Sequence, residues 1–384
     1  MTSSWSLSLW PQVASSAAVG FLAAGFAQPV YAQSATFDSG TTAVLSGSFA
    51  AVDRAVAGAT FDAEVDAVFS TDTGAFALYA PGRYGAFAEF TVPTADLELL
   101  PATPVMKPRV LSVGGGSVYD WHSGPDGFTV QPLSWGSVSG ALQLSAGRLD
   151  LDGNFRKLAV RTSPGTVKLA VFDQFMAPLG GWCEVAIDPT AEETVLYQMM
   201  DGAFPILTTQ ASTRLIAQDC VVPIDPVPLA IKDGFFSSAR HTRLEGGTFV
   251  AWMTPIGNGT SDQLQLFNGA AMELGPTVQL PAGLNGLGLA AGDLDDHDGS
   301  DEVCVLTHST SGMALQLYRR PTGSSALTEL ATLPTPPSLS AFVSGSPAVA
   351  DFDGDGDDDV VAIHTNGSTR QSVLWRNGRI DHDQ

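Results

Sequence analysis

The sequence predicts an all-β fold built from repeated units, and three observations support this prediction. Short runs rich in β-branched and aromatic residues alternate with turns rich in Gly and Pro. No stretch after residue 32 shows the long 3.6-residue apolar period of an amphipathic helix. An acidic loop followed by an apolar strand recurs along the chain.

The composition is that of a folded, turn-rich chain with a large negative charge. Of the 384 residues, 44% are hydrophobic and 15% are charged, with 40 Gly and 24 Pro. Forty acidic residues against eighteen basic ones give a formal charge of −22. Such a charge repels nucleic acid and anionic lipid and attracts divalent cations, so nucleic acid is not an expected partner.

The N-terminal segment has the features of a secretory signal. Residues 1–32 contain no charged side chain, and an apolar run from Ala17 to Phe26 leads to Val30-Tyr31-Ala32, which has small residues at the −3 and −1 positions. We predict cleavage after Ala32. An uncleaved N-terminal anchor and a misassigned start are the alternatives, because no Lys or Arg precedes the run. After cleavage we expect no transmembrane anchor and a secreted, cell-surface or periplasmic location.

The strongest motif is an acidic loop near the C-terminus. It places carboxylates at positions 1, 3, 5 and 9 and Gly356 at position 6, where a sharp turn is needed. Six Asp in nine residues repel one another, so a tightly folded loop needs a counter-ion. Calcium is the oxygen-seeking cation available outside the cell. The predicted metal ligands are Asp351, Asp353, Asp355 and Asp359.

The residues on either side of this loop indicate strands. An EF-hand shares the early positions but needs a Glu at position 12, where this chain has Ala362. Upstream, Ser340–Ala350 contains Pro347 among small and β-branched residues, and downstream Val360–Ile363 is a buried-strand run. The loop is therefore predicted to join two strands.

A second copy of the loop precedes the apolar run Val303–Leu306. Aligning the downstream strands makes His297 part of a one-residue insertion and puts Glu302 at position 9, with Asp301 as the alternative closing ligand. The predicted ligands of this copy are Asp293, Asp295, Asp298 and Glu302.

These loops resemble the FG-GAP or VCBS repeats, the β-propeller repeats also seen in the integrin α-subunit head. The resemblance is specific over 351–359, extends to 293–302 and is thin elsewhere. It implies bound Ca²⁺ and an acidic loop between the first two strands of some blades, with one four-stranded antiparallel sheet per repeat. The clearest repeats span about 280–335 and 338–380.

Weaker copies suggest how many blades the chain holds. A decayed repeat at about 141–175 has Arg148 at position 1, so we expect it to be metal-free. Successive loops would then fall at Asp62, a turn near Pro104, Asp150, Thr190, a turn near Arg240, Asp295 and Asp353. Intervals of roughly 40 to 60 residues predict a seven-bladed β-propeller over 33–384, with six or eight blades as alternatives. Another alternative is a β-sandwich from 33 to about 104 before a shorter propeller, with 223–228 as a possible linker.

Several local features extend this prediction. Ala75–Tyr79 and Ala86–Val92 read as a hairpin, and Val167–Phe172 reads as a strand. Cys304 is predicted to be a buried strand residue. A disulfide between Cys183 and Cys220 is left open.

No catalytic motif stands out. The chain has no G-x-S-x-G elbow, phosphate-binding loop, zinc-binding H-E-x-x-H or dinucleotide fingerprint. Tryptophans near strands are expected to pack between sheets, with sugar binding at an exposed rim as the alternative. The sequence therefore predicts a non-enzymatic calcium-binding scaffold for protein or glycan. An extracellular carbohydrate lyase or hydrolase and a structural module of a surface assembly are the alternatives.

Overall fold

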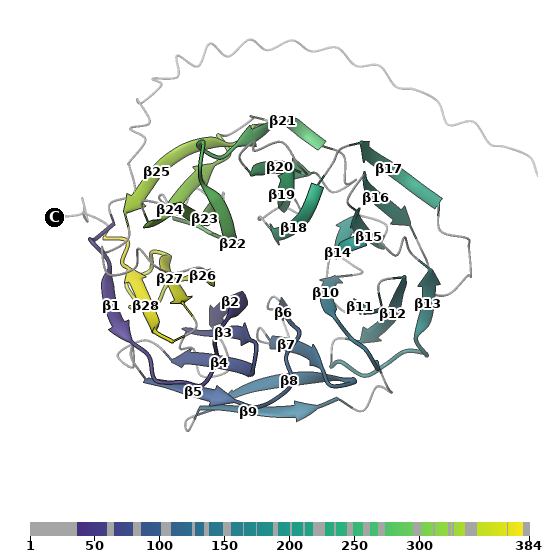
Figure 1. Ribbon diagram of the computed structural model, residues 1–384. Coiled ribbons are helices and arrows are strands. Elements are labelled where there is room, and N and C mark those ends of the chain that lie inside the picture. Colours follow the sequence, from purple (N-terminus) through teal and green to yellow (C-terminus); the bar gives the residue numbers. More distant parts are fainter. Residues whose placement is uncertain are drawn as a thin grey trace, which may run out of the picture. The chain divides into compact units, whose positions relative to one another are not determined.

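The fold consists of antiparallel strands that pair mainly with their neighbours in the chain (Figure 1). The computed structural model describes residues 37–378 with gaps at 60–64, 80–85, 101–108, 125–126, 134–137, 149–154, 164, 174, 187–190, 200–201, 210–211, 218–226, 234–235, 244–248, 256–261, 268–272, 295–300, 310–311, 322–323, 325, 335–343 and 367. The predicted signal segment lies outside the described residues. No helix occurs among the residues that are described, in agreement with the missing 3.6-residue period.

Within the described ranges, the strands form seven four-stranded sheets. The first three sheets contain β2 (Val52–Ala59), β3 (Val65–Thr71), β4 (Gly74–Tyr79) and β5 (Ala86–Phe90); β6 (Asp96–Leu100), β7 (Arg109–Gly114), β8 (Ser117–Gly124) and β9 (Gly127–Pro132); and β10 (Gln143–Arg148), β11 (Phe155–Ser163), β12 (Thr166–Asp173) and β13 (Cys183–Ala186). The next two contain β14 (Ala191–Met199), β15 (Gly202–Thr209), β16 (Ser212–Ala217) and β17 (Val227–Asp233); and β18 (Phe236–Arg243), β19 (Phe249–Pro255), β20 (Gln263–Phe267) and β21 (Glu273–Gln279). The last two contain β22 (Asn285–Gly292), β23 (Glu302–Ser309), β24 (Gly312–Arg319) and β25 (Thr328–Pro334); and β26 (Ser344–Ala350), β27 (Asp359–Thr365), β28 (Arg370–Trp375) and β1 (Thr41–Val44).

Consecutive sheets meet through their first strands. β2 contacts β6, and the contacts continue through β10, β14, β18 and β22 to β26. β26 also contacts β2, so the last sheet lies beside the first. Residues Ser34–Gln384 form one compact unit. The segment considered as a separate sandwich contributes strands to three different sheets.

The last sheet joins the two ends of the described chain. β1 pairs antiparallel with β28, with Thr41 opposite Leu374 and Val44 opposite Gln371. β28 in turn pairs with β27, which pairs with β26. A strand from the beginning of the described chain therefore completes a sheet that is otherwise formed by its end.

The core lies between neighbouring sheets. One apolar cluster joins residues of β3 and β4 to residues of β26, β27 and β28, and another joins β23 and β24 to the opposite face of that last sheet. Trp375 is 0% exposed in the second cluster, where the predicted strand residue Cys304 is also buried. Burying each large apolar side chain contributes about 1.5–3 kcal/mol, so these junctions hold the sheets together.

Most of the local predictions agree with the strands that are observed. β4 pairs with β5, with Tyr79 opposite Ala86, as the hairpin prediction required. The predicted strand Val167–Phe172 lies within β12. Pro347 lies in β26, at the edge of its sheet, which is where proline is tolerated in a sheet.

Loop positions that no acidic motif marks could be predicted only roughly. Arg240, near which a turn was predicted, lies inside β18 opposite Trp252, and β18 ends at Arg243. The turn predicted near Pro104 and the weak copy at Thr190 lie outside the described residues. Because Asp, Thr and Pro are common in turns of every kind, composition alone could not fix the exact positions.

Candidate metal centre

The acidic loop joins β26 to β27, and its first carboxylate organises the turn. Asp351 Oδ1 accepts hydrogen bonds from the backbone N–H groups of Gly354 (2.7 Å) and Asp355 (3.1 Å), and Oδ2 accepts one from Gly356 (3.0 Å). Gly354 and Gly356 have φ angles of 81° and 100°, which favour glycine. The loop therefore folds back around Asp351, as the spacing of the motif predicts.

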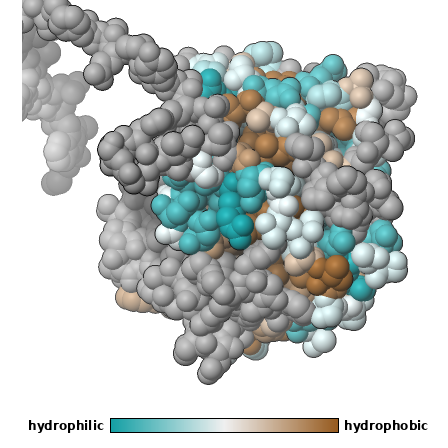
Figure 2. Space-filling view, turned by 90° about the vertical axis from the view of Figure 1, so that its left-hand side faces the viewer, coloured by the Kyte–Doolittle hydropathy of each residue, from teal (hydrophilic) through white to brown (hydrophobic). Residues whose placement is uncertain are grey.

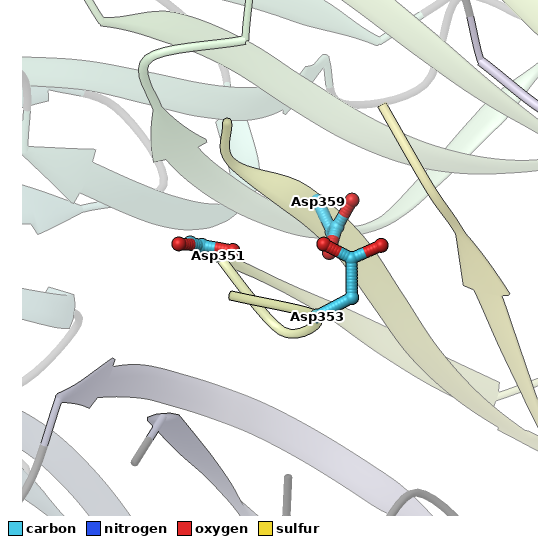
Figure 3. Close-up of side chains that lie close together, drawn as sticks. All are labelled: Asp351, Asp353 and Asp359. Carbon is cyan, nitrogen blue, oxygen red and sulfur yellow. The ribbon is translucent and has the colours of Figure 1, made fainter. Parts of the chain in front are cut away.

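Three of the predicted ligands come together. Asp351, Asp353 and Asp359 each place one carboxylate oxygen within 4.8 Å of the others. Figure 3 shows that Asp351 and Asp353 come from the loop and Asp359 from the start of β27. Asp355 is not in this group, and its Oδ1 accepts the N–H of Asp357 at 3.0 Å. The group thus gathers oxygen donors from positions 1, 3 and 9.

Asp359 is the buried member of the group. Its side chain is 0% exposed, Oδ1 accepts the N–H of Asn377 (2.8 Å) and Oδ2 accepts the N–H of Phe352 (3.0 Å). Burial raises the pKa of Asp359 to about 7, and the charges of Asp353 and Asp355 add to this effect although both hydrogen bonds oppose it. A nearby cation would favour the ionised form.

Asp353, at the surface of the loop, is affected by burial and by neighbouring charges in the same way as Asp359. Partial burial raises its pKa, and the charges of Asp355 and Asp351 raise it further. Arg376 supplies a positive charge, with Nε 3.6 Å from Asp353 Oδ2, but its side chain is 42% exposed. An exposed pair at this distance neutralises little of the repulsion.

The second acidic loop is only partly described. Asp295 and Asp298 lie outside the described residues, as do the decayed copy at Asp150 and the weak copy at Asp62. The N–H of Leu294 donates to Glu302 Oε2 at 2.9 Å, and Glu302 is 1% exposed at the start of β23. In the last sheet, the N–H of Phe352 donates to Asp359 Oδ2 in the same way. Glu302, rather than Asp301, therefore occupies the place in its sheet that Asp359 has in the last one.

The donor set fits a hard divalent cation. All three gathered donors are carboxylate oxygens, the kind of ligand that calcium binds, and glycines give the loop the tight path around them. Soft metals prefer sulfur or imidazole ligands, which this group does not include.

Two contacts at the site could not be found from the motif. Asp358 Oδ2 accepts the N–H of Asp293, the first predicted ligand of the neighbouring loop, at 2.9 Å. Asn377 follows β28, and its Nδ2 donates to the carbonyl of Leu294 at 2.9 Å. Both contacts depend on how two sheets pack, and the spacing within one repeat carries no signal of it.

Comparison with known proteins supports the repeat and the fold. A family model described as an FG-GAP-like repeat matches residues 296–362, so the chain carries the repeat that its acidic loops resemble. No curated protein matches the chain.

Two solved structures are similar over most of the chain. One is the BP39L lectin from Burkholderia pseudomallei, with a TM-score of 0.58, 14% identity, and coverage of 86% of this chain and 99% of the lectin. The other is BBS1N, crystallised in complex with ARL6DN, with a TM-score of 0.55, 11% identity, and coverage of 90% and 98%. At such low identity the likeness shows the fold alone, which is all-β and β-propeller-like.

Proposed function

We propose that the chain is a calcium-stabilised β-propeller that acts as a non-enzymatic, secreted or surface-associated scaffold for binding protein or glycan. The observation that carries the proposal is the group of three carboxylates from Asp351, Asp353 and Asp359 within an FG-GAP-like repeat. In this proposal Asp351, Asp353 and Asp359 supply charged oxygens to the cation, and Asp351 also shapes the loop.

A closed ring of seven blades is part of the proposal. It is supported by the contacts of first strands from sheet to sheet, including β26 with β2, and by β1, which completes the last sheet. A closed ring leaves no long sheet edge unpaired between blades. Its two faces are formed by loops, and either face can bind a ligand. The described residues include no helix that could span a membrane.

The binding role is supported by the two similar structures, because one is a lectin and the other was crystallised with a protein partner. The fold also supports enzymes, so the binding role has to be tested directly. We expect the protein to bind a subset of immobilised glycans, or a protein ligand, without cleaving it. Turnover of a bound glycan would contradict the non-enzymatic role.

The calcium role is tested by thermal unfolding of the full chain in EDTA and in millimolar calcium. Binding to the folded state alone stabilises it by about 2.7 kcal/mol at a hundredfold excess over Kd, so the unfolding midpoint should rise in calcium. The variant Asp353→Ala should lose this rise, and Glu184→Ala, an exposed carboxylate on β13, should keep it. A wild-type unfolding midpoint that is the same in EDTA and in calcium would contradict the calcium role.

A further inference from the structure

The dipeptide Arg376–Asn377, directly after β28, contacts the acidic loop and the preceding sheet. Asn377 is 7% exposed; its N–H donates to Asp359 Oδ1 and its Nδ2 donates to the carbonyl of Leu294. The backbone of Asn377 therefore holds one of the three gathered carboxylates, while its side chain fixes that backbone against the loop after β22.

The same dipeptide holds the segment that leads into β1. The N–H of Asp38 donates to the carbonyl of Arg376 (3.0 Å), and the N–H of Arg376 donates back to Asp38 Oδ1 (3.3 Å). Phe37 forms an isolated antiparallel bridge with Asn377. Asp38 Oδ1 also accepts the N–H of Gly40, so this carboxylate orders the turn before β1.

The guanidinium of Arg376 lies between two carboxylates. Nε is 3.6 Å from Asp353 Oδ2, and Nη1 is 3.8 Å from Asp38 Oδ2. A divalent cation bound by Asp353 would satisfy that carboxylate and repel the guanidinium, which leaves Asp38 as its remaining partner. Figure 2 shows hydrophilic residues gathered on the side of the molecule that lies at the left of Figure 1, where β1 and β28 are found.

We propose that Arg376 and Asn377 form a clasp that couples cation binding at the acidic loop to the docking of the N-terminal strand β1. This inference rests on the proposed calcium binding. A bound cation fixes Asp359, which fixes the backbone of Asn377, and it directs Arg376 toward Asp38. Both effects strengthen the attachment of residues 37–44 to the last sheet. Binding and docking must then favour each other equally, because coupling between two sites is reciprocal.

Hydrogen exchange of the full chain tests the clasp, with calcium binding measured in parallel by calorimetry. In millimolar calcium, amide groups of Thr41–Val44 should exchange at least several-fold more slowly than in EDTA. Amide groups of Val118–Trp121, in a different sheet, serve as the internal reference and should change little.

Two variants distinguish coupling through the clasp from a general stabilisation of the fold by calcium. Arg376→Gln and Asp38→Asn should still bind calcium but lose part of its effect on the exchange of β1, because the contact of Asn377 with Asp359 remains. The matched control Lys168→Gln removes one cation from an ion pair with Glu184 in another sheet, and it should keep that effect. Calcium binding with unchanged exchange of β1 in the wild type would overturn the clasp and leave the calcium proposal standing. A wild type that binds no calcium would overturn both.

Discussion

At the scale of single residues, the main feature is a pair of buried acids at equivalent places in neighbouring sheets. Asp359 begins β27 and Glu302 begins β23, and each accepts the N–H of the second residue of its acidic loop. A buried carboxylate loses the solvation of its charge, so it needs hydrogen bonds and a nearby cation to remain ionised. These acids link the loop to the strand that follows it.

The raised pKa of Asp359 predicts that the stability of the protein depends on pH and that calcium changes this dependence. Its folded pKa of about 7 is above its ordinary value, so its stabilising contribution is complete at low pH and is lost as pH rises through 7. In EDTA this group therefore favours the folded state more at pH 5 than at pH 8. Calcium needs the ionised form, so the calcium-induced rise in Tm should grow from pH 5.5 to pH 8.

Thermal unfolding at several pH values, with and without calcium, measures this effect. The variant Asp359→Asn cannot ionise, and its smaller calcium response should vary less over the same pH range. A wild-type calcium response that is constant from pH 5.5 to pH 8 would contradict the assignment of the raised pKa to a ligand.

His364 on β27 predicts a second, opposite pH effect. The side chain is 0% exposed, and burial lowers its pKa to about 3. Because the unfolded state takes up a proton near pH 6.5 and the folded state does not, His364 costs stability as pH falls from 6.5 toward 3, by at most about 1.4 kcal/mol per pH unit. Denaturant unfolding in calcium should show that His364→Leu has a shallower loss of stability over pH 4–6.5. Equal slopes in both proteins would show that His364 is not responsible.

At the scale of elements, the acidic loop of the last sheet packs on the end of the first strand of the preceding sheet. A Cβ on Gly292 would lie 2.3 Å from Val349 Cγ1 and 2.6 Å from Asp358 Oδ2. The close approach allows Asp358 to accept the N–H of Asp293. A glycine at this point of β22 is therefore required by the packing of the two sheets.

Gly292→Ala should destabilise the protein by about 1–3 kcal/mol, because the added methyl group forces β22 and β26 apart. Denaturant unfolding measures the loss. Gly181→Ala is the matched control, since a Cβ there meets nothing within 4 Å, and it should change stability by less than about 0.5 kcal/mol. Equal effects of the two substitutions would show that the contact with Asp358 and Val349 does not limit packing.

The acidic loop could be predicted from sequence because the residues that define it lie close together in the chain. The spacing of Asp351, Asp353 and Asp359 and the glycine at 356 specify a turn between two strands without any knowledge of the rest of the chain. The parts contributed by Asn377 and Asp358 could not be predicted in this way. They depend on the register of β28 and on the packing of two sheets, which no short motif encodes.

At the scale of the whole molecule, the all-β fold and its four-stranded sheets follow from strand-like runs separated by turns. The acidic loop that begins at Asp351 lies between β26 and β27, as its motif predicts. Without such a motif, as near Arg240, an even spacing does not fix a loop to the residue, because the lengths of strands and connections vary, and Arg240 itself lies inside β18. The place of β1 in the last sheet also depends on long-range pairing that the sequence pattern does not show.

The junction between the last two sheets should carry much of the stability of the molecule. Trp375→Ala removes a side chain that is 0% exposed in the cluster shared by these sheets, and the cost should be about 3–5 kcal/mol in denaturant unfolding. Phe175→Ala, at a side chain 65% exposed, is the control and should cost little. A small loss in Trp375→Ala would mean that the sheets unfold independently of this junction.

The most direct test of the metal centre is a calorimetric titration of the full chain with calcium. We expect a saturable heat of binding that the triple variant Asp351→Asn, Asp353→Asn, Asp359→Asn reduces by at least one site, because the three charged donors that gather at the start of β27 are neutralised. The same number of sites and the same affinity in the triple variant would contradict the assignment of this loop as the metal centre.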